Sequence, residues 1–403
     1  MAAALGVLVS CGSVKSGEEV VAASRDSKVV VAYVTSWSEV MPDPQYMTHI
    51  NYAFGHVNES FNGVKIDNEE RLRQIVDLRK QKPELKVLLS IGGWGSGRFS
   101  EMAANDEYRR AFAADCDRVV KEFALDGIDI DWEYPTSSMA NISSSPDDTE
   151  NFTLLMQDIR AAIGNEKELT LATVASARYI DFKAILPSVD FVNIMAYDMA
   201  SAPKHHSALY PSGHSGDITS DGAVTAHLKA GVPPSKLVMG MPFYGRGGDG
   251  YPSFQDYNKV GNTDTQYTEK WDEVAQVPYL ADKNDTLVFG FENPRSLAIK
   301  CQYILDKDLL GGMYWDYSGD NEQGDLRRTV AENLLGKPHK AKVLVLTERG
   351  GQHGGFTDAG LRWLAAEGVK GEFQYYRDKQ CQEHNGGLLV ACSAWYSIGF
   401  PAL

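Results

Sequence analysis

Eight short apolar runs, separated by segments of helical pattern, constrain the fold of this chain more than any other feature. Each run is long enough for one buried β-strand and too short for a helix of ordinary length. Parallel strands need a crossover connection, usually a helix, so this alternation predicts a parallel α/β sheet. The runs are residues 29–34, 49–54, 87–91, 127–132, 169–174, 191–196, 237–241 and 311–315.

The segments between these runs carry apolar residues at helical spacing. The clearest stripe recurs at i, i+4, i+7, i+8 and i+11 and suits a helix that packs on a sheet. Its members are Phe112, Cys116, Val119, Val120 and Phe123. Similar stripes occur within residues 152–159 and 326–334. The first connection, residues 36–47, contains prolines and is too short for a good helix.

Eight strand–helix units predict a (β/α)8 TIM barrel over residues 28–336. A segment rich in Gly, Asp, Asn and Tyr, about residues 247–293, separates the seventh and eighth strands and is predicted to be an insertion. A doubly wound open sheet is the alternative fold. That fold would need a glycine-rich phosphate turn after the first strand, and residues 34–37 do not provide one.

The fourth run carries an acid at every second position. Successive side chains alternate between the two faces of a strand, so Asp129, Asp131 and Glu133 share one face and apolar residues occupy the other. Residues two apart on a strand have Cα atoms about 7 Å apart. Three like charges at this spacing resist simultaneous ionisation, so at least one carboxyl should keep its proton near neutral pH. That is the requirement for a general acid. Two alternatives are a Mg²⁺ or Ca²⁺ site and a solvated strand face.

This run closely resembles the signature of glycoside hydrolase family 18, the chitinases and their relatives. The signature Asp-x-x-Asp-x-Asp-x-Glu matches Asp126, Asp129, Asp131 and Glu133. Other strand ends resemble further blocks of the family in the same order: Ser90-Ile91-Gly92-Gly93, Met195-Ala196-Tyr197-Asp198, Gly240-Met241-Pro242-Phe243-Tyr244-Gly245-Arg246 and Met313-Tyr314-Trp315-Asp316.

The resemblance implies a reaction and a site. All the acids come from one strand, so no carboxylate faces them across the sugar, and family 18 solves this by substrate-assisted, retaining catalysis. The implied roles are Glu133 as general acid and base, Asp131 as the acceptor that orients the acetamido group, and Asp129 as the residue that shares a proton with Asp131. Tyr197 is implied to donate to the acetamido oxygen. Substrate contacts are implied for Trp315, Tyr33, Trp94, Met195, Asp198, Tyr244 and Arg246.

The resemblance also implies that the insertion is a small α+β module beside the substrate groove, and that no metal or organic cofactor takes part. We expect β-1,4-linked N-acetylglucosamine polymers, chitin or its oligosaccharides, as substrate. Trp132 and the pair Tyr134-Pro135 around the acid favour this choice. An endo-β-N-acetylglucosaminidase that acts on N-glycans and an inactive chitin-binding lectin are the alternatives.

Composition limits the partners of the chain. A net charge of −15 argues against nucleic acid or an anionic membrane surface and is compatible with a neutral polysaccharide. Five scattered cysteines do not form a disulfide framework. We expect a monomer.

Two terminal segments are predicted to lie outside the barrel. Leu8-Val9-Ser10-Cys11 resembles a bacterial lipobox, so we expect lipidation at Cys11, with residues 1–27 as leader and tether of a cell-surface or periplasmic lipoprotein. A secreted protein and a disordered leader are the alternatives. Residues 337–403 are predicted to be a linker and a truncated second domain, because a strand at 343–346 and the glycine-rich turn at 350–355 resemble the start of a trehalose-utilisation (ThuA-like) domain. The alternative is an extension that packs on the barrel.

Overall fold

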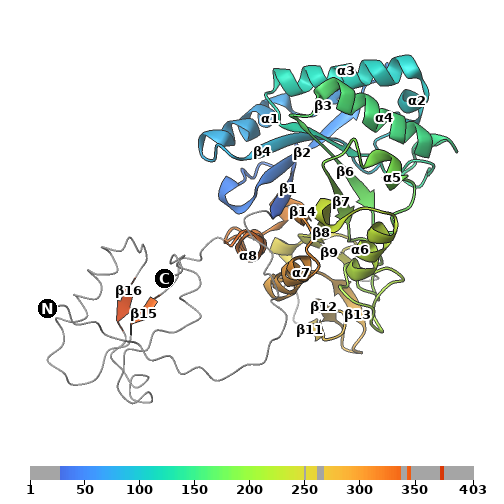
Figure 1. Ribbon diagram of the computed structural model, residues 1–403. Helices are drawn as coiled ribbons and strands as arrows, with labels where there is room; N and C mark the ends of the chain where they lie inside the picture. The colour runs from blue at the N-terminus through green and yellow to red at the C-terminus, as the bar shows by residue number, and fades with distance from the viewer. Residues whose placement is uncertain (1–27, 249–250, 261–266, 337–342, 346–372, 376–403) are drawn as a thin grey trace, which may run out of the picture.

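The computed structural model shows eight parallel strands that close into a barrel (Figure 1). The strands follow one another around the ring in the order β1-β14-β8-β7-β6-β5-β4-β2, and pairing of β1 with β2 closes it. This confirms the predicted TIM barrel and excludes the open sheet, which would leave two edges. The strands are β1 (Val29–Thr35), β2 (His49–Val57), β4 (Lys86–Gly92), β5 (Gly127–Asp131), β6 (Glu168–Val174), β7 (Phe191–Met195), β8 (Leu237–Pro242) and β14 (Gly311–Trp315).

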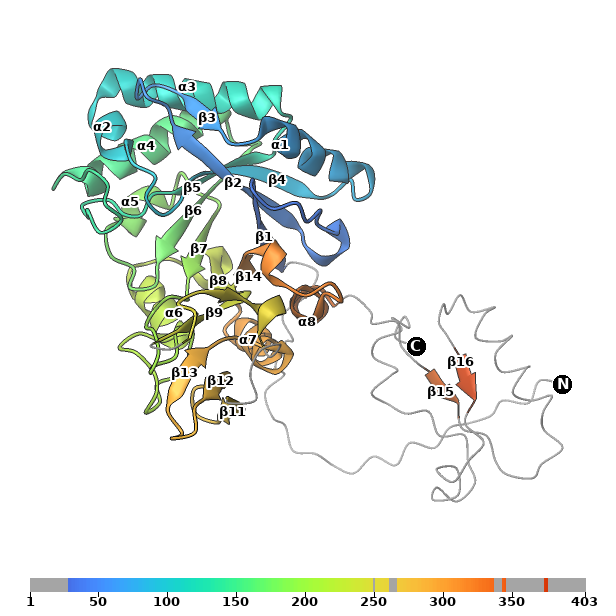
Figure 2. The same ribbon diagram turned by 180° about the vertical axis from the view of Figure 1, so that it is seen from behind.

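Helices cover the outside of the barrel, and α3 and α4 lie side by side there in both views (Figures 1 and 2). Helix α3 begins after Asn105, whose side chain accepts from two backbone N–H groups of the first turn. Its predicted apolar stripe is buried. The helices are α1 (Glu69–Val76), α2 (Phe99–Ala104), α3 (Asp106–Glu122), α4 (Asp148–Ile163), α5 (Phe182–Ile185), α6 (Ser220–Lys229), α7 (Pro294–Asp306) and α8 (Asp325–Leu335).

The connection after β1 contains no α-helix, as its prolines predicted, and forms only the 3-10 turn η2 (Pro44–Tyr46). A short strand, β3 (Val64–Ile66), pairs antiparallel with the end of β2. None of the described helices is long and apolar enough to cross a membrane.

The insertion between β8 and α7 is a five-stranded antiparallel sheet, and it begins at Tyr244, slightly before its predicted start. Its described residues form strands and the 3-10 turn η5 (Tyr257–Lys259) without an α-helix, whereas the resemblance implied an α+β module. Each of its regular segments has five residues or fewer, a length that suits strands better than helices. The strands are β9 (Tyr244–Gly247), β10 (Gln255–Asp256), β11 (Thr268–Asp272), β12 (Val277–Ala281) and β13 (Leu287–Gly290).

The structure describes residues 28–248, 251–260, 267–336, 343–345 and 373–375. The predicted lipidation site Cys11 lies outside these residues, as does most of the predicted second domain. Within that domain, β15 (Val343–Val345) lies where a strand was predicted and pairs in parallel with β16 (Phe373–Tyr375).

Candidate active site

The acid row of β5 points into the barrel, as the alternation of the strand predicted. Asp129, Asp131 and Glu133 are all buried, with exposed fractions of 0%, 4% and 9%. The opposite face belongs to the apolar core, where the Trp132 ring stacks on Phe99 at 5.3 Å between centroids. A solvated strand face is therefore excluded.

Asp129 lies deepest and is held by four donors from four other strands. One of its oxygens accepts from the hydroxyls of Tyr33 at 2.9 Å and Ser90 at 2.8 Å. The other accepts from the Thr170 hydroxyl at 2.6 Å and the Asn193 amide at 3.3 Å. Burial raises the pKa of Asp129, and these four hydrogen bonds oppose that rise because they stabilise the charged form.

Asp131 has no such compensation, and Glu133 has only one compensating hydrogen bond. Burial first, and then the charges of Glu133 and Asp129, raise the pKa of Asp131 well above its usual range. One Asp131 oxygen is buried without a hydrogen-bond partner among the described residues. Burial also raises the pKa of Glu133 to about 7, with the charge of Asp198 adding to the rise and a hydrogen bond from Tyr134 opposing it. The expected proton retention in the acid row therefore has a physical basis.

No hydrogen bond joins the carboxyl groups of Asp129 and Asp131 in the described part of the chain, and the interaction between them is electrostatic. The proton that the two residues were predicted to share stays a prediction.

Two glycines let the loop after β4 pass directly against the acid strand. A Cβ on Gly92, whose φ is +133°, would lie 2.0 Å from the Asp131 carbonyl oxygen. The backbone N–H of Gly93 donates to that same oxygen at 2.9 Å. A Cβ on Gly93 would meet the Phe54 ring at 2.6 Å. The Ser-x-Gly-Gly block therefore fixes the position of Asp131 through its backbone.

Tyr197 and Asp198 extend the site from the end of β7. The Tyr197 hydroxyl donates to the Met313 sulfur at 3.8 Å, and sulfur is a weak acceptor that a substrate oxygen can replace. Asp198 forms a two-bond ion pair with Arg246, at 2.6 Å for each contact. Hydrogen bonds and charge from Arg246 and His206 hold the pKa of Asp198 below its usual range, despite its partial burial. Asp198 is therefore anionic near neutral pH.

Two groups of aromatic rings belong to the site. In the first, the half-buried Trp315 ring lies 5.6 Å from Tyr33, 5.6 Å from Phe54 and 6.4 Å from Trp37. In the second, Trp94 meets Tyr134 edge-on at 6.4 Å and is 62% exposed. Flat, partly exposed rings of this kind offer apolar platforms with defined orientation.

These residues surround one cleft of about 720 Å³ at the carboxyl ends of the strands, a size that suits a small-molecule or oligosaccharide ligand. The structure brings ten of the predicted site residues to its wall, and Asp129 lies beneath them. The ten are Tyr33, Trp94, Asp131, Glu133, Met195, Tyr197, Asp198, Tyr244, Arg246 and Trp315.

Several wall residues were not among the predicted site residues. Trp37 and Phe54 lie at or just beyond strand ends, where an aromatic residue could have been proposed. Arg178 and Tyr179 come from the loop after β6, where no sequence pattern marked them. The others are Tyr134, Met139, Ala172, Val174, Ala175, Ser176, Met199, Ile218 and Phe254.

Asp126, the first acid of the motif, lies apart from the cleft, before the start of β5. It accepts from the Val87 backbone at 2.7 Å and pairs with Arg79. These contacts hold the start of the acid strand against the neighbouring strand β4. Across the described residues, no group of three His, Cys, Asp or Glu side chains is placed to hold a metal ion.

A closed parallel barrel with buried acids and aromatic platforms at its carboxyl-terminal mouth defines a TIM-barrel glycosidase. Comparison with known proteins identifies the family. The sequence model of "Glycosyl hydrolases family 18" matches residues 29–320, and the chain belongs to this family.

Two relatives are similar to this chain in sequence. The chain is 30% identical to Chitinase A1 of Niallia circulans over 75% of its own length and 58% of that protein, so it spans less than two thirds of that relative. It is 31% identical to Chitotriosidase-1 of Mus musculus, over 73% of this chain and 74% of that protein.

Solved structures of the same family are similar to this chain in fold. A family 18 N-acetylglucosaminidase from Paenibacillus barengoltzii has a TM-score of 0.70 and 32% identity and covers 76% of this chain and 99% of its own. The Group IV chitinase of Ostrinia furnacalis has a TM-score of 0.70 and 28% identity, over 77% of this chain and all of that one (100%).

Proposed function

We propose that this glycosidase cleaves β-1,4 bonds between N-acetylglucosamine units, in chitin or chitooligosaccharides, by retaining, substrate-assisted catalysis. One observation carries the proposal. Burial raises the pKa of Glu133 to about 7, so this carboxyl can hold a proton near neutral pH, and no carboxylate of the described cleft wall outside the acid row is free to act as a nucleophile.

Asp198 is the one carboxylate in the described wall that lies outside the acid row, and its ion pair makes it a poor nucleophile. Both of its oxygens accept from the Arg246 guanidinium. A two-step retaining mechanism with an enzyme nucleophile needs a free carboxylate about 5 Å from the acid. The substrate must therefore supply the attacking atom, and the carbonyl oxygen of a 2-acetamido group on the sugar can do so.

The residues then take the following parts. Glu133 protonates the leaving oxygen and later removes a proton from the incoming water. Asp131, with its unpartnered oxygen, accepts from the acetamido N–H and offsets the positive charge that develops on the ring formed by the acetamido group. Tyr197 exchanges its weak sulfur contact for the acetamido oxygen. Trp315 supports the apolar face of the same sugar.

The test combines one variant with one substrate analogue. Glu133→Gln should remove nearly all turnover while oligosaccharide binding survives, measured by calorimetry. A glucosamine oligomer without acetyl groups should resist cleavage, because it lacks the attacking oxygen. Rapid hydrolysis of the deacetylated oligomer, or inversion at the anomeric carbon by NMR, contradicts substrate assistance.

An N-acetylglucosaminidase that releases single sugars is the second candidate, and the similarity to the N-acetylglucosaminidase of Paenibacillus barengoltzii, 99% of which this chain covers, favours it. Product analysis on a chitin hexamer distinguishes the two, since single sugars from the start indicate exo action and mixed shorter oligomers indicate a chitinase. A glycoprotein substrate assayed in parallel tests the endo-β-N-acetylglucosaminidase alternative. A wild-type protein that binds chitin oligosaccharides but cleaves none of these substrates would favour the lectin.

We also propose that Cys11 carries a lipid and anchors the enzyme outside the cytoplasm of a bacterium. The lipobox-like sequence Leu8-Val9-Ser10-Cys11 supports this proposal. Mass spectrometry of the mature N-terminus, with Cys11→Ser as control, tests it. Release of a protein without lipid into the medium favours secretion.

A further inference from the structure

Four buried ionisable side chains lie outside the described wall of the cleft and have no part in the proposed mechanism. His205 and His206 lie in the loop after β7, Glu292 lies between β13 and α7, and Lys300 belongs to α7. Their exposed fractions are 1%, 1%, 1% and 0%. Burial of an ionisable group is unfavourable unless other groups compensate it, so this cluster calls for an explanation.

The ion pair between Lys300 and Glu292 holds the loop after β7 at Ser207. The Lys300 ammonium group pairs with Glu292 Oε1 and also donates to the Ser207 carbonyl at 2.5 Å. The Ser207 hydroxyl donates to the same Glu292 oxygen at 2.6 Å. Ser207 is therefore held at two atoms by one buried pair, whose opposite charges compensate each other.

The same loop contacts the insertion through His205. Its Nε2 atom lies 3.1 Å from an oxygen of Asp272 in β11. Burial lowers the pKa of His205 to about 4, although Asp272 opposes this shift, so the imidazole is neutral near neutral pH. Gly290 of β13 passes beside the loop, since a Cβ there would lie 3.6 Å from the Cα of His205. The position of residues 205–207 therefore depends on how the insertion packs on the barrel.

His206 connects this loop to the cleft. The backbone N–H of Asp198 donates to His206 Nδ1 at 3.4 Å, and Nδ1 lies 3.4 Å from Asp198 Oδ1. The His206 carbonyl accepts from the Met199 N–H at 3.0 Å, and the buried ring lies 5.3 Å from that of Tyr244. Asp198 has a φ of +54°, an uncommon conformation for a residue other than glycine. His206 thus contacts both the backbone and the carboxylate of a residue in a restricted conformation.

We propose that His206 is a positioning residue for Asp198. The buried pair of Lys300 and Glu292 keeps this histidine in place through Ser207. The inference rests on the proposed function, in which Asp198 lies in the wall of the substrate cleft and its charge raises the pKa of the catalytic acid. A misplacement of about 1 Å can lower a catalytic rate about 100-fold, so a buried support of this kind affects turnover without touching the substrate.

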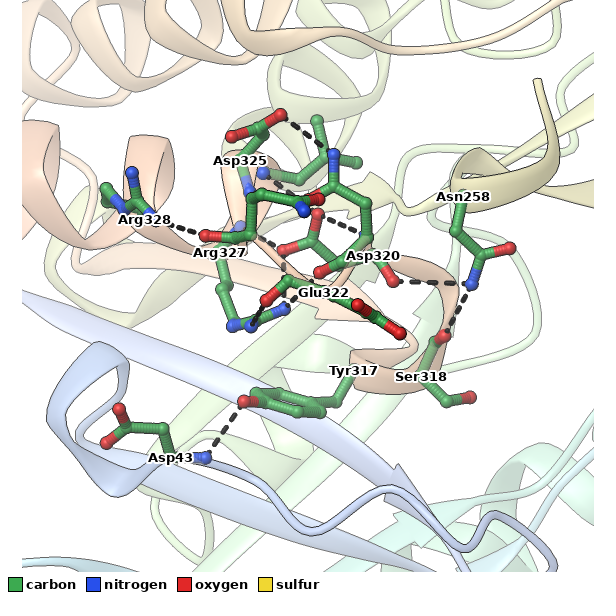
Figure 3. A network of polar contacts seen from close by, with 12 residues as sticks. Asp43, Asn258, Tyr317, Ser318, Asp320, Glu322, Asp325, Arg327 and Arg328 are labelled. Atoms are coloured by element: carbon green, nitrogen blue, oxygen red, sulfur yellow. Dashed lines mark hydrogen bonds and ion pairs between the residues drawn. The ribbon is translucent and has the colours of Figure 1, made fainter. Parts of the chain in front are cut away.

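The insertion has a second attachment to the barrel, at the segment after β14. The Asn258 side chain, in η5, donates to the Ser318 carbonyl at 3.2 Å and to the Asp320 carbonyl at 3.3 Å (Figure 3). Buried Asp320 also accepts from the Arg327 backbone at 2.9 Å, which joins this contact to helix α8 (Figure 3). Asn258 offers a matched control, because its removal loosens the same insertion and leaves the contacts of His206 unchanged.

The experiment compares two substitutions of His206. His206→Phe keeps a ring of similar shape and removes Nδ1, so kcat/KM on a chitin tetramer should fall about tenfold. His206→Asn should lose much less, because the asparagine amide group reaches the position of Nδ1 and can hydrogen-bond to Asp198. The control Asn258→Ala should leave kcat/KM unchanged while it lowers the melting temperature.

A double variant separates positioning from packing. Because His206 acts through the Asp198 carboxylate, His206→Phe should change kcat/KM by no more than about twofold in a protein that already carries Asp198→Asn. Ser207→Ala removes only the hydroxyl bond to Glu292 and should lower kcat/KM about threefold. This milder variant provides the measurement where His206→Phe does not fold.

Several outcomes overturn the inference. Full kcat/KM in folded His206→Phe does so, and so does an equal loss in His206→Phe and His206→Asn. Effects of His206→Phe and Asp198→Asn that multiply in the double variant assign His206 to packing alone. Unchanged kcat/KM in Ser207→Ala overturns the role of the buried pair. A wild-type enzyme that cleaves no oligosaccharide instead refutes the proposed function.

Discussion

The raised pKa of Glu133 predicts the pH range in which the enzyme works. A general acid must carry its proton, so kcat/KM should fall as pH rises through the pKa of the free enzyme. With the pKa at about 7 instead of the usual 4.5, roughly half of the molecules hold this proton at pH 7, against roughly 0.3% without the shift. Burial thus raises the competent fraction about 150-fold, which corresponds to about 3 kcal/mol.

Asp198 is the charge that can be removed to test this reasoning. It is anionic across the assay range, and its charge raises the pKa of Glu133. Asp198→Asn should therefore lower the pKa of Glu133, and the freed positive charge of Arg246 acts in the same direction. We expect the alkaline limb of kcat/KM to move to lower pH by up to about one pH unit, since Asp198 is a smaller contributor than burial.

The assay is hydrolysis of a soluble aryl chitobioside between pH 4 and 9 at constant ionic strength. The control is Glu84→Gln, which neutralises an exposed carboxylate just before β4, at the opposite end of the barrel from the cleft. An alkaline limb that stays in place in Asp198→Asn, or that moves to higher pH, refutes the assignment of this limb to Glu133.

Three further predictions concern how the site is held. Glu133→Gln should stabilise the protein at pH 8.5 by up to about 3 kcal/mol in urea unfolding and should have no such effect below pH 4. The reason is that the raised pKa of Glu133 in the folded state makes the wild-type protein less stable as the pH rises from 4.5 through about 7. Asp148→Ala should destabilise the protein by about 3 kcal/mol, since buried Asp148 accepts from the Thr136 and Ser145 backbones and from the Ser100 hydroxyl. Asp148→Asn should cost much less, because its oxygen can accept both backbone N–H groups and its amide can donate to the Ser100 hydroxyl. Equal losses would contradict this. Gly92→Ala should abolish turnover and lower the melting temperature, because its Cβ meets the Asp131 carbonyl; full activity would contradict the close approach.

The sequence predicts the barrel well because each barrel strand is a short apolar run that can be recognised from the sequence. All eight apolar runs became barrel strands, with ends that differ from the prediction by only a few residues, since each run combines burial with a length that excludes most helices. The orientation of the acid row is predicted equally well, because side chains alternate between the two faces of a strand and Asp131 must share a face with Asp129 and Glu133. The structure of the insertion is predicted less well, since the sequence of short segments without strong periodicity does not show which strands pair with each other.

The walls of the cleft are the part that sequence reasoning could not supply. Tyr179 stacks on Tyr134 at 5.6 Å from a loop more than forty residues further along the chain, in a conformation with φ of +76°. Nothing in the pattern around Tyr179 marks such a contact, because tertiary structure alone brings the two loops together. The same holds for Arg71, whose contact with the Val40 carbonyl depends on the placement of a helix.

The contrast between Asp129 and Asp131 shows how the fold divides two identical side chains between different tasks. Four donors fix Asp129 and favour its charged form. Asp131, two residues on, has an oxygen without a hydrogen-bond partner among the described residues, and burial and the charges of Glu133 and Asp129 raise its pKa. A carboxyl held by four bonds cannot turn toward a substrate, whereas one without them can, as the acceptor role proposed for Asp131 requires. Because Thr170 and Ser90 lie beside Asp129 in the strand register, the barrel itself produces this difference.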